Sequence, residues 1–223
     1  LKEVIELFPS ELIHIGGDEC PKDRWKECEH CQAMMKAQGL ENEEALQGYL
    51  VTRIEKFLNA QGRRIIGWDE ILEGGVTPSS TVMAWRGAKI GAYAAEHGHE
   101  VVMTPLPICY FDFYQTESRE GEGLRIGGHI NFEKIYSWDP FEGISESARK
   151  NIIGVQCNVW SEYLKDISMV EGQLLPRLAA MCEVQWAVDR RDESTIRRKM
   201  ENLRKFYDAC GWNYAPYYFD GRQ

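Results

Sequence analysis

The sequence predicts an α/β fold in which helices cover a parallel β-sheet, and three observations support this prediction. The chain has 223 residues, which is enough for one sizeable hydrophobic core. Short apolar runs alternate along the chain with longer segments of helical periodicity, as they do in β/α units. Gly39, Gly62 and Gly98 follow three of the predicted helices, at the position where glycine commonly ends a helix.

The first part of the chain predicts one strand among helices. The end of a helix over residues 2–8 stops before Pro9, because the residue preceding a proline disfavours helical geometry. The apolar, β-branched run within 11–18 predicts strand one. Helices are predicted over 24–38 and over 42–60, and the apolar residues of the second fall on one helical face.

The middle of the chain predicts three more strands. Strands two, three and four are predicted over 64–68, 81–85 and 100–104, since each is a short run rich in apolar and β-branched residues. A short helix over 88–97 separates the last two of these strands. A second extended piece is predicted over 108–112.

The last part of the chain begins with its least regular stretch. Residues 113–150 are rich in glycine and hold one short predicted helix near 131–136. A loop of this length in a compact domain is usually functional. Strand five is predicted over 151–159, a long helix over 169–188 and a final helix over 194–208.

This assignment contains five β/α units. A complete barrel needs eight strands and about 250 residues. We therefore expect a TIM (β/α)8 barrel of which only about the last five β/α units lie in this chain, residues 1–223 forming one partial barrel domain. The chain opens with Leu1 rather than Met, as a sequence cut from a longer one would. Open strand edges would offer a surface for self-association.

Composition and charge exclude several classes of partner. The net charge is −9 and the sequence pI is about 5.2, which argues against nucleic acid because phosphate binding needs a basic patch. No apolar run approaches the roughly 20 residues of a membrane span.

Seven cysteines cannot all pair within the chain, and Cys28 and Cys31 form a C-x-x-C motif. The sequence is compatible with free thiols, with a local disulfide and with a zinc site at these cysteines, although a zinc site normally needs four ligands.

Two neighbouring carboxylates are the most informative feature of the chain. Residues 14–19 read His-Ile-Gly-Gly-Asp-Glu and place Asp18 and Glu19 at the C-terminal end of strand one, where an α/β barrel keeps its chemistry. A regular strand would send adjacent side chains to opposite faces. The two glycines let the backbone become irregular, so that both carboxylates can reach one pocket.

Aromatic and acidic residues also follow the other predicted strands. They are Trp68, Trp85, Tyr110, Asp112, Trp160 and Glu162. Flat rings cover the apolar C–H faces of a pyranose, and carboxylates accept hydrogen bonds from its hydroxyl groups. A single tryptophan at a strand end is more often a core residue, and Asp69 and Glu70 fit the N-terminus of a helix equally well. Three tryptophans at matching strand ends favour a sugar site.

The run His14-Ile-Gly-Gly-Asp-Glu19 resembles the H-x-G-G-D-E signature of glycoside hydrolase family 20, the β-N-acetylhexosaminidases. The later strand-end residues follow in the family's order, and the resemblance extends over residues 10–190. In this family the Gly-Gly-Asp-Glu strand is the fourth of eight, so the resemblance implies that strands 4–8 of the barrel lie in this chain. In this family an arginine that binds the sugar hydroxyl groups and a histidine of the substrate pocket lie on earlier strands. Neither has a counterpart in this chain.

The resemblance implies a role for each matching residue. Glu19 is expected to be the general acid/base, and Asp18 is expected to orient and polarise the 2-acetamido group of the substrate. The remaining matches are expected to bind substrate: aromatic walls from Trp68, Trp85 and Trp160, a contact to the acetamido oxygen from Tyr110, and hydroxyl-binding carboxylates from Asp112 and Glu162.

The implied reaction is retaining, substrate-assisted hydrolysis of terminal non-reducing N-acetyl-D-hexosamine from β-linked glycans. The expected partner is therefore a glycan ending in β-linked GlcNAc or GalNAc, with no metal and no organic cofactor. Members of this family are usually exported, to the periplasm, the cell surface or the medium. The alternative is a carbohydrate-binding fragment without catalytic activity of its own. An α-amylase-like or metal-dependent barrel hydrolase is disfavoured, because the five histidines are few and scattered.

Overall fold

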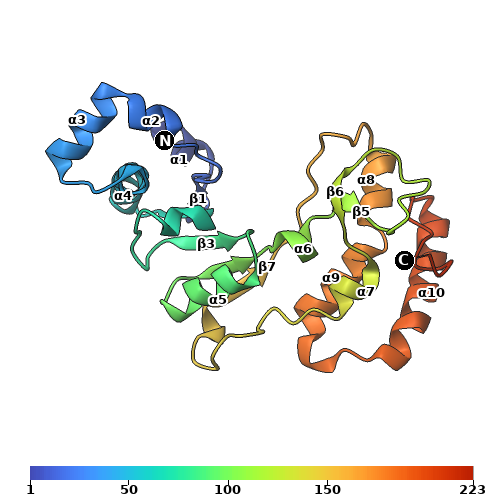
Figure 1. Cartoon of the computed structure of the whole chain (residues 1–223). Coiled ribbons are helices and arrows are strands. Elements are labelled where there is room, and N and C mark those ends of the chain that lie inside the picture. The colour runs from blue at the N-terminus through green and yellow to red at the C-terminus, as the bar shows by residue number, and fades with distance from the viewer. Residues whose placement is uncertain (223) are drawn as a thin grey trace. The chain divides into compact units, whose positions relative to one another are not determined.

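The computed structural model describes residues 1–222 and divides the chain into two compact units. Unit 1 contains residues 1–103 and 143–153, and unit 2 contains residues 104–142 and the chain from 154 onward. Figure 1 colours the elements of both units from the N-terminus to the C-terminus. Among the described residues, no helix combines the length and the apolarity needed to cross a membrane.

Unit 1 is built on a parallel sheet. Its strands β1 (Leu12–His14), β2 (Arg64–Trp68), β3 (Thr81–Ala84) and β4 (Val101–Met103) are neighbours in that order. The register pairs Ile13 with Ile65. The sheet continues with β7 (Ile152–Val155), whose first two residues belong to unit 1. Consecutive parallel strands joined by helices confirm the predicted α/β fold.

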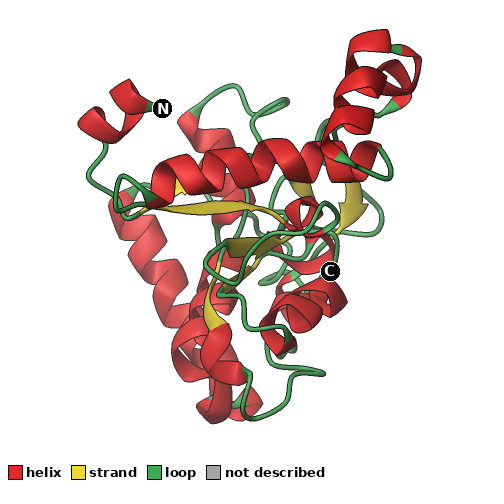
Figure 2. Cartoon of the chain, turned by 90° about the vertical axis from the view of Figure 1, so that its left-hand side faces the viewer, coloured by secondary structure: helices red, strands yellow, loops and turns green. Residues whose placement is uncertain are grey.

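Helices flank this sheet, and Figure 2 shows them in red beside the yellow strands. The helices of unit 1 are α1 (Lys2–Leu7), α2 (Asp23–Glu27), α3 (Glu29–Gln38), α4 (Glu43–Asn59), α5 (Ala88–Glu96) and the 3₁₀ helices η1 (Asp69–Leu72) and η2 (Arg149–Asn151). The apolar face of α4 packs on β2, and α5 packs on β3 and β4. Leu58, Ile65 and Val82 are wholly buried between these layers, which places the core of unit 1 under α4 and α5.

Unit 2 is mostly helical. Its elements are α6 (Leu106–Cys109), β5 (Phe113–Tyr114), β6 (Ile126–His129), α7 (Phe132–Tyr136), α8 (Ile167–Leu174), α9 (Arg177–Ala187), η3 (Val188–Arg190) and α10 (Glu193–Cys210). Strands β5 and β6 pair in parallel, and α7 packs against α9 (Figure 1). Phe111, Ile135 and Met181 are buried at the centre of this unit.

Several predicted elements differ from the observed ones for local reasons. The helix predicted over 169–188 is two helices, because Pro176 has no N–H to continue the first. The helix predicted over 24–38 is likewise divided, at Cys28. The extended piece predicted over 108–112 begins instead as the short helix α6, with a proline in its first turn.

The seven cysteines are all free thiols within the described chain.

Candidate active site

The backbone turns sharply after β1. Strand one is shorter than predicted and ends at His14, because Gly16 and Gly17 adopt φ angles of +71° and +109°. Glu19 also lies in the left-handed region, at φ +47°. The irregular geometry that the sequence predicted here is therefore confirmed. It leaves the side chains of Asp18 and Glu19 exposed at the C-terminal end of the strand.

Neighbouring elements hold this turn in place. A Cβ atom added to Gly17 would lie 2.5 Å from Cγ2 of Ile71, so the position tolerates no side chain. The Nε2 atom of Gln47, on α4, donates to the carbonyl oxygen of Gly17 at 2.8 Å. The backbone N–H of Trp68 donates to the carbonyl oxygen of Gly16 at 3.0 Å. The ends of β1 and β2 are thus tied together.

His14 lies near Asp18 and was not among the predicted site residues. Its ring meets the edge of the Trp68 ring, with the centroids 5.2 Å apart. Its Nδ1 atom accepts a hydrogen bond from the backbone N–H of Gly16 at 3.0 Å, so this nitrogen carries no proton. Partial burial lowers the pKa of His14, and the nearby charge of Asp18 opposes this effect. At neutral pH the ring is therefore uncharged.

Two carboxylates at the end of β2 form hydrogen bonds to the ends of the neighbouring strands β1 and β3. Glu70 accepts a hydrogen bond from the backbone N–H of Glu19 at its Oε2 atom, over 2.9 Å. Asp69 is wholly buried and accepts from the backbone N–H groups of Trp85 at 2.8 Å and Arg86 at 3.0 Å. It also forms an ion pair with the Arg86 guanidinium. These acids do begin the 3₁₀ helix η1, yet their side chains bond to other elements.

Unit 2 brings Tyr110 and Trp160 together. Tyr110 forms a parallel bridge with Asn158, and the backbone N–H of Phe111 donates to the carbonyl oxygen of Asn158 at 2.8 Å. The same asparagine donates from its side chain to the Thr104 hydroxyl at 2.8 Å. The rings of Tyr110 and Trp160 have centroids 6.4 Å apart, and Trp160 remains 43% exposed. An exposed indole beside a tyrosine suits the face of a sugar ring.

Asp112 is a buried carboxylate with unused acceptor capacity. It is 3% exposed, and neither of its oxygens has a hydrogen-bond partner among residues 1–222. The pKa of Asp112 is raised to about 6, chiefly by burial and also by the charge of Glu162, while the residue's own backbone N–H and the Arg177 guanidinium oppose these effects. Buried acceptors without donors are costly, so this carboxylate is suited to bind hydroxyl donors of a ligand.

Arg177 organises the segment that carries Tyr110 and Asp112. Its guanidinium is wholly buried and donates to the carbonyl oxygens of Phe111, of Ile130 at 2.9 Å and of Gln173 at 2.8 Å. Burial lowers its pKa to about 9, so the group stays charged at neutral pH. Sequence reasoning missed this residue, although an arginine between apolar neighbours on the inner side of a helix was a usable signal.

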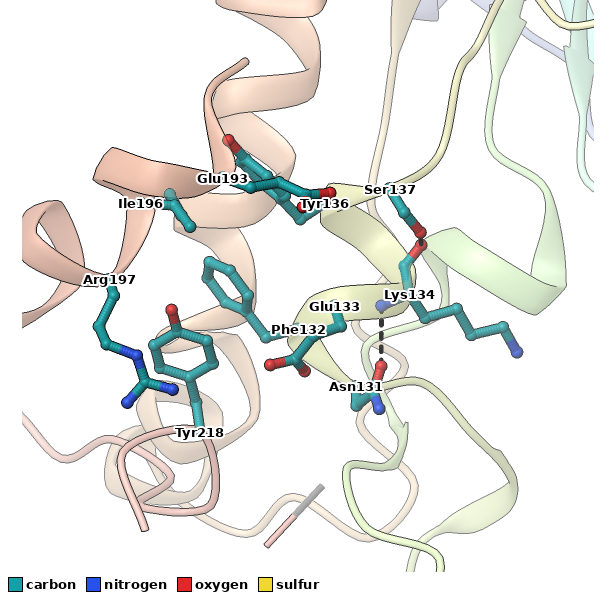
Figure 3. A pocket seen from close by; sticks show the side chains of 10 residues that line it. All are labelled: Asn131, Phe132, Glu133, Lys134, Tyr136, Ser137, Glu193, Ile196, Arg197 and Tyr218. Atoms are coloured by element: carbon teal, nitrogen blue, oxygen red, sulfur yellow. Dashed lines mark hydrogen bonds between the residues drawn. The ribbon is translucent and has the colours of Figure 1, made fainter. Parts of the chain in front are cut away.

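One cavity of unit 2 contains none of the predicted site residues. It encloses about 530 Å³ between α7 and the start of α10 (Figure 3). The rings of Phe132 and Tyr218 face each other in it, with centroids 4.2 Å apart, and the Asn131 side chain accepts from the backbone N–H of Lys134. Its lining also includes two acidic and two basic residues, Glu133, Glu193, Lys134 and Arg197, which distinguishes it from an aromatic-walled sugar site.

The eight predicted site residues therefore fall into two groups. Unit 1 carries Asp18, Glu19, Trp68 and Trp85 at the ends of β1, β2 and β3, and unit 2 carries Tyr110, Asp112, Trp160 and Glu162. Within unit 1, Glu70 and Asp69 link neighbouring strand ends. Within unit 2, the rings of the two aromatic residues lie together, and the charge of Glu162 raises the pKa of the Asp112 carboxyl.

Comparisons with known proteins agree on one family. The sequence model described as "Glycosyl hydrolase family 20, catalytic domain" matches residues 1–189. A β-hexosaminidase of Porphyromonas gingivalis is 42% identical over 217 residues, which are 96% of this chain and 28% of that protein. A β-hexosaminidase of Vibrio furnissii is 34% identical over 184 residues, which are 81% of this chain and 30% of that protein.

Solved structures give the same result. The crystal structure of a GH20 exo-β-N-acetylglucosaminidase from Vibrio harveyi, in complex with N-acetylglucosamine, superposes with a TM-score of 0.86 at 29% sequence identity. The match covers 96% of this chain and 34% of that one. The chain thus spans about a third or less of the length of these relatives.

Proposed function

Because the chain belongs to glycoside hydrolase family 20, we propose that the protein hydrolyses terminal non-reducing N-acetyl-D-hexosamine residues from β-linked glycans. The observation that carries this proposal is the turn after β1, which presents Asp18 and Glu19 side by side at the C-terminal end of a parallel strand. This strand end is where a (β/α) barrel places its catalytic residues. The match over most of the chain includes this turn.

The proposed reaction retains the anomeric configuration through assistance by the substrate. Most retaining glycosidases place two carboxylates about 5–5.5 Å apart, and family 20 is an exception in which the substrate supplies the nucleophile. The acetamido oxygen attacks the anomeric carbon while Glu19 protonates the departing oxygen. Asp18, ionised, accepts the acetamido N–H and stabilises the positive charge of the cyclic oxazolinium. Water then opens this ring, and Glu19 takes up the proton of that water.

The other predicted residues bind the sugar in this proposal. Trp68, Trp85 and Trp160 cover its apolar faces, and Tyr110 donates to the acetamido oxygen. Asp112 and Glu162 accept hydrogen bonds from hydroxyl groups. The unpaired, buried carboxylate of Asp112 supports this role, since hydroxyl donors would satisfy both of its oxygens. Export of the protein, which the family resemblance implies, stays a prediction.

A second candidate function is sugar binding without turnover. It is favoured by the exposed ring of Trp160 beside Tyr110 and by the unpaired carboxylate of Asp112, which can bind a sugar without any bond being broken. Aromatic residues and unpaired carboxylates at strand ends would retain affinity for a pyranose even where catalytic geometry is incomplete. Calorimetric binding of N-acetylglucosamine, combined with no hydrolysis, would select this candidate.

Hydrolysis of 4-nitrophenyl N-acetyl-β-D-glucosaminide and its galacto isomer tests the proposal. We expect release of 4-nitrophenol, a first-formed sugar of β configuration by proton NMR, and no hydrolysis of the corresponding β-D-glucoside, which lacks the acetamido group. A first-formed α anomer, or equal rates on the glucoside, would contradict substrate assistance. Running both isomers also measures the preference between gluco and galacto configurations.

A further inference from the structure

Glu19 occupies a backbone conformation that needs support from elsewhere. Its φ angle of +47° lies in the left-handed region, which residues with a Cβ atom rarely adopt. Gly16 and Gly17 adopt positive φ angles of their own, but their lack of a Cβ atom relieves no strain at Glu19 itself. Because general acid catalysis depends on where the proton donor lies, whatever holds this residue contributes to the reaction.

Glu70 provides this support across the sheet. Its Oε2 atom accepts the backbone N–H of Glu19 at 2.9 Å, although the residues are 51 positions apart in the chain. Glu70 follows β2, which pairs with β1 through the register of Ile13 and Ile65. The turn after β1 is therefore fixed to the neighbouring strand by a charge-assisted hydrogen bond, which is stronger than a bond between neutral groups.

The neighbouring acid shows what a purely structural carboxylate looks like at this strand end. Both oxygens of Asp69 are satisfied, one by two backbone N–H groups and the other by the Arg86 guanidinium. Among the described residues, the side chain of Glu70 forms a hydrogen bond only with the backbone N–H of Glu19. Its Oε1 atom is buried without a partner. Burying an unpaired carboxylate oxygen is unfavourable. Glu70 thus stabilises the turn of Glu19 at a cost to its own solvation.

We infer that Glu70 is a positioning residue, which holds the acid/base Glu19 at the reacting bond through the hydrogen bond to its backbone. This inference rests on the proposed function for the role of Glu19. It does not make Glu70 a proton donor or a substrate ligand. Removing the bond should therefore weaken the steps that need Glu19 and spare those that do not.

The leaving group of the substrate distinguishes positioning of the acid from a general structural effect. Glu70→Ala should lower kcat/KM for a methyl N-acetyl-β-glucosaminide, whose leaving group needs protonation, by about 10²-fold. For a 2,4-dinitrophenyl glycoside, which departs without protonation, kcat/KM should stay within about tenfold of the wild type. Equal losses on both substrates would overturn the inference.

The conservative variant tests the hydrogen bond itself. Glu70→Gln keeps a carbonyl oxygen that can accept the Glu19 N–H and removes the negative charge. It should restore most of the activity that Glu70→Ala loses on the alkyl substrate. A Gln variant as impaired as the Ala variant would show that charge, not position, matters, and would refute the inference.

Amide hydrogen exchange of Glu19 separates this inference from the proposed function. Exchange at the Glu19 N–H should accelerate by about tenfold or more in Glu70→Ala and stay slow in Glu70→Gln, since a lost hydrogen bond exposes the amide to water. Glu73→Ala is the matched control, because Glu73 follows the same 3₁₀ helix and pairs with Arg86 instead. Unchanged exchange in Glu70→Ala overturns the inference even in an active enzyme. Absence of hydrolysis by the wild type would count against the proposed function alone.

Discussion

The Arg177 guanidinium lies over the ring of Phe111, with its central carbon 4.8 Å from the ring centroid. The same group donates to the carbonyl oxygen of Phe111, so it contacts both the side chain and the backbone of this residue. Phe111 stands between Tyr110 and Asp112 in the chain. A single buried cation on α9 therefore holds the segment that carries two of the proposed sugar-binding residues.

Replacing this cation should destabilise unit 2. Arg177→Met would leave the buried carbonyl oxygen of Ile130 without its donor and that of Phe111 with Gln173 Nε2 alone, at a cost of about 3 kcal/mol or more in the free energy of unfolding. Urea denaturation followed by circular dichroism measures this loss. Arg198→Met, at an exposed position of α10, is the control and should change stability by less than about 0.5 kcal/mol. Equal stability of the two variants would refute the role of Arg177.

Asp112 should make stability depend on pH in the opposite sense to an ion-paired acid. Its pKa in the folded chain is about 6, above the ordinary value of 3.8, so the folded state holds a proton that the unfolded state releases between these values. The free energy of unfolding should therefore fall as the pH rises from about 4 to about 6, and this contribution should be constant above that range. Asp112→Asn should remove it. Parallel pH profiles of wild type and variant, measured by urea denaturation, would contradict this assignment.

The two neighbouring carboxylates should differ in their dependence on the leaving group. Glu19→Gln removes the proton donor, so kcat/KM should fall by about 10²–10⁴-fold on alkyl glycosides and much less on 2,4-dinitrophenyl glycosides. Asp18→Asn misplaces the internal nucleophile and should reduce both. Steady-state kinetics on the two substrates measure the contrast. Near-normal rates in Asp18→Asn would rule out substrate assistance.

Gly48 should not tolerate a methyl group although it lies within a helix. A Cβ atom there would come within 2.0 Å of the Gly74 carbonyl oxygen, and backbone cannot move aside as a flexible side chain can. Alanine normally stabilises a helix relative to glycine by about 1 kcal/mol. We expect Gly48→Ala to destabilise the chain by about 2 kcal/mol or more instead, measured as a thermal midpoint. Gly127→Ala, with no atom within 4 Å of the added Cβ, should have little effect.

Sequence periodicity predicted three elements of unit 1 closely, although β1 is shorter than predicted and the helix predicted over 24–38 is divided. Strand β2 lies at the predicted residues 64–68, and α5 and β3 end one residue earlier than predicted. Gly39 ends α3 in the left-handed conformation, at φ +66°. These features depend on residues close in sequence, such as a glycine after a helix or a run of β-branched residues. The failures at Pro176 and at α6 involve prolines, whose local effect outweighs an apolar pattern that continues through them.

The chain alone determined the α/β class and the strand-end residues expected to do the chemistry, because hydrophobic period, glycine placement and the Asp18-Glu19 motif are local properties. Only the folded molecule decided which groups hold these residues in place. The bond from Glu70 to Glu19 spans 51 positions and the bond from Arg177 to Phe111 spans 66. Such pairs form when helices and strands pack, because backbone carbonyl and N–H groups then bond to the partner that the packing brings close to them.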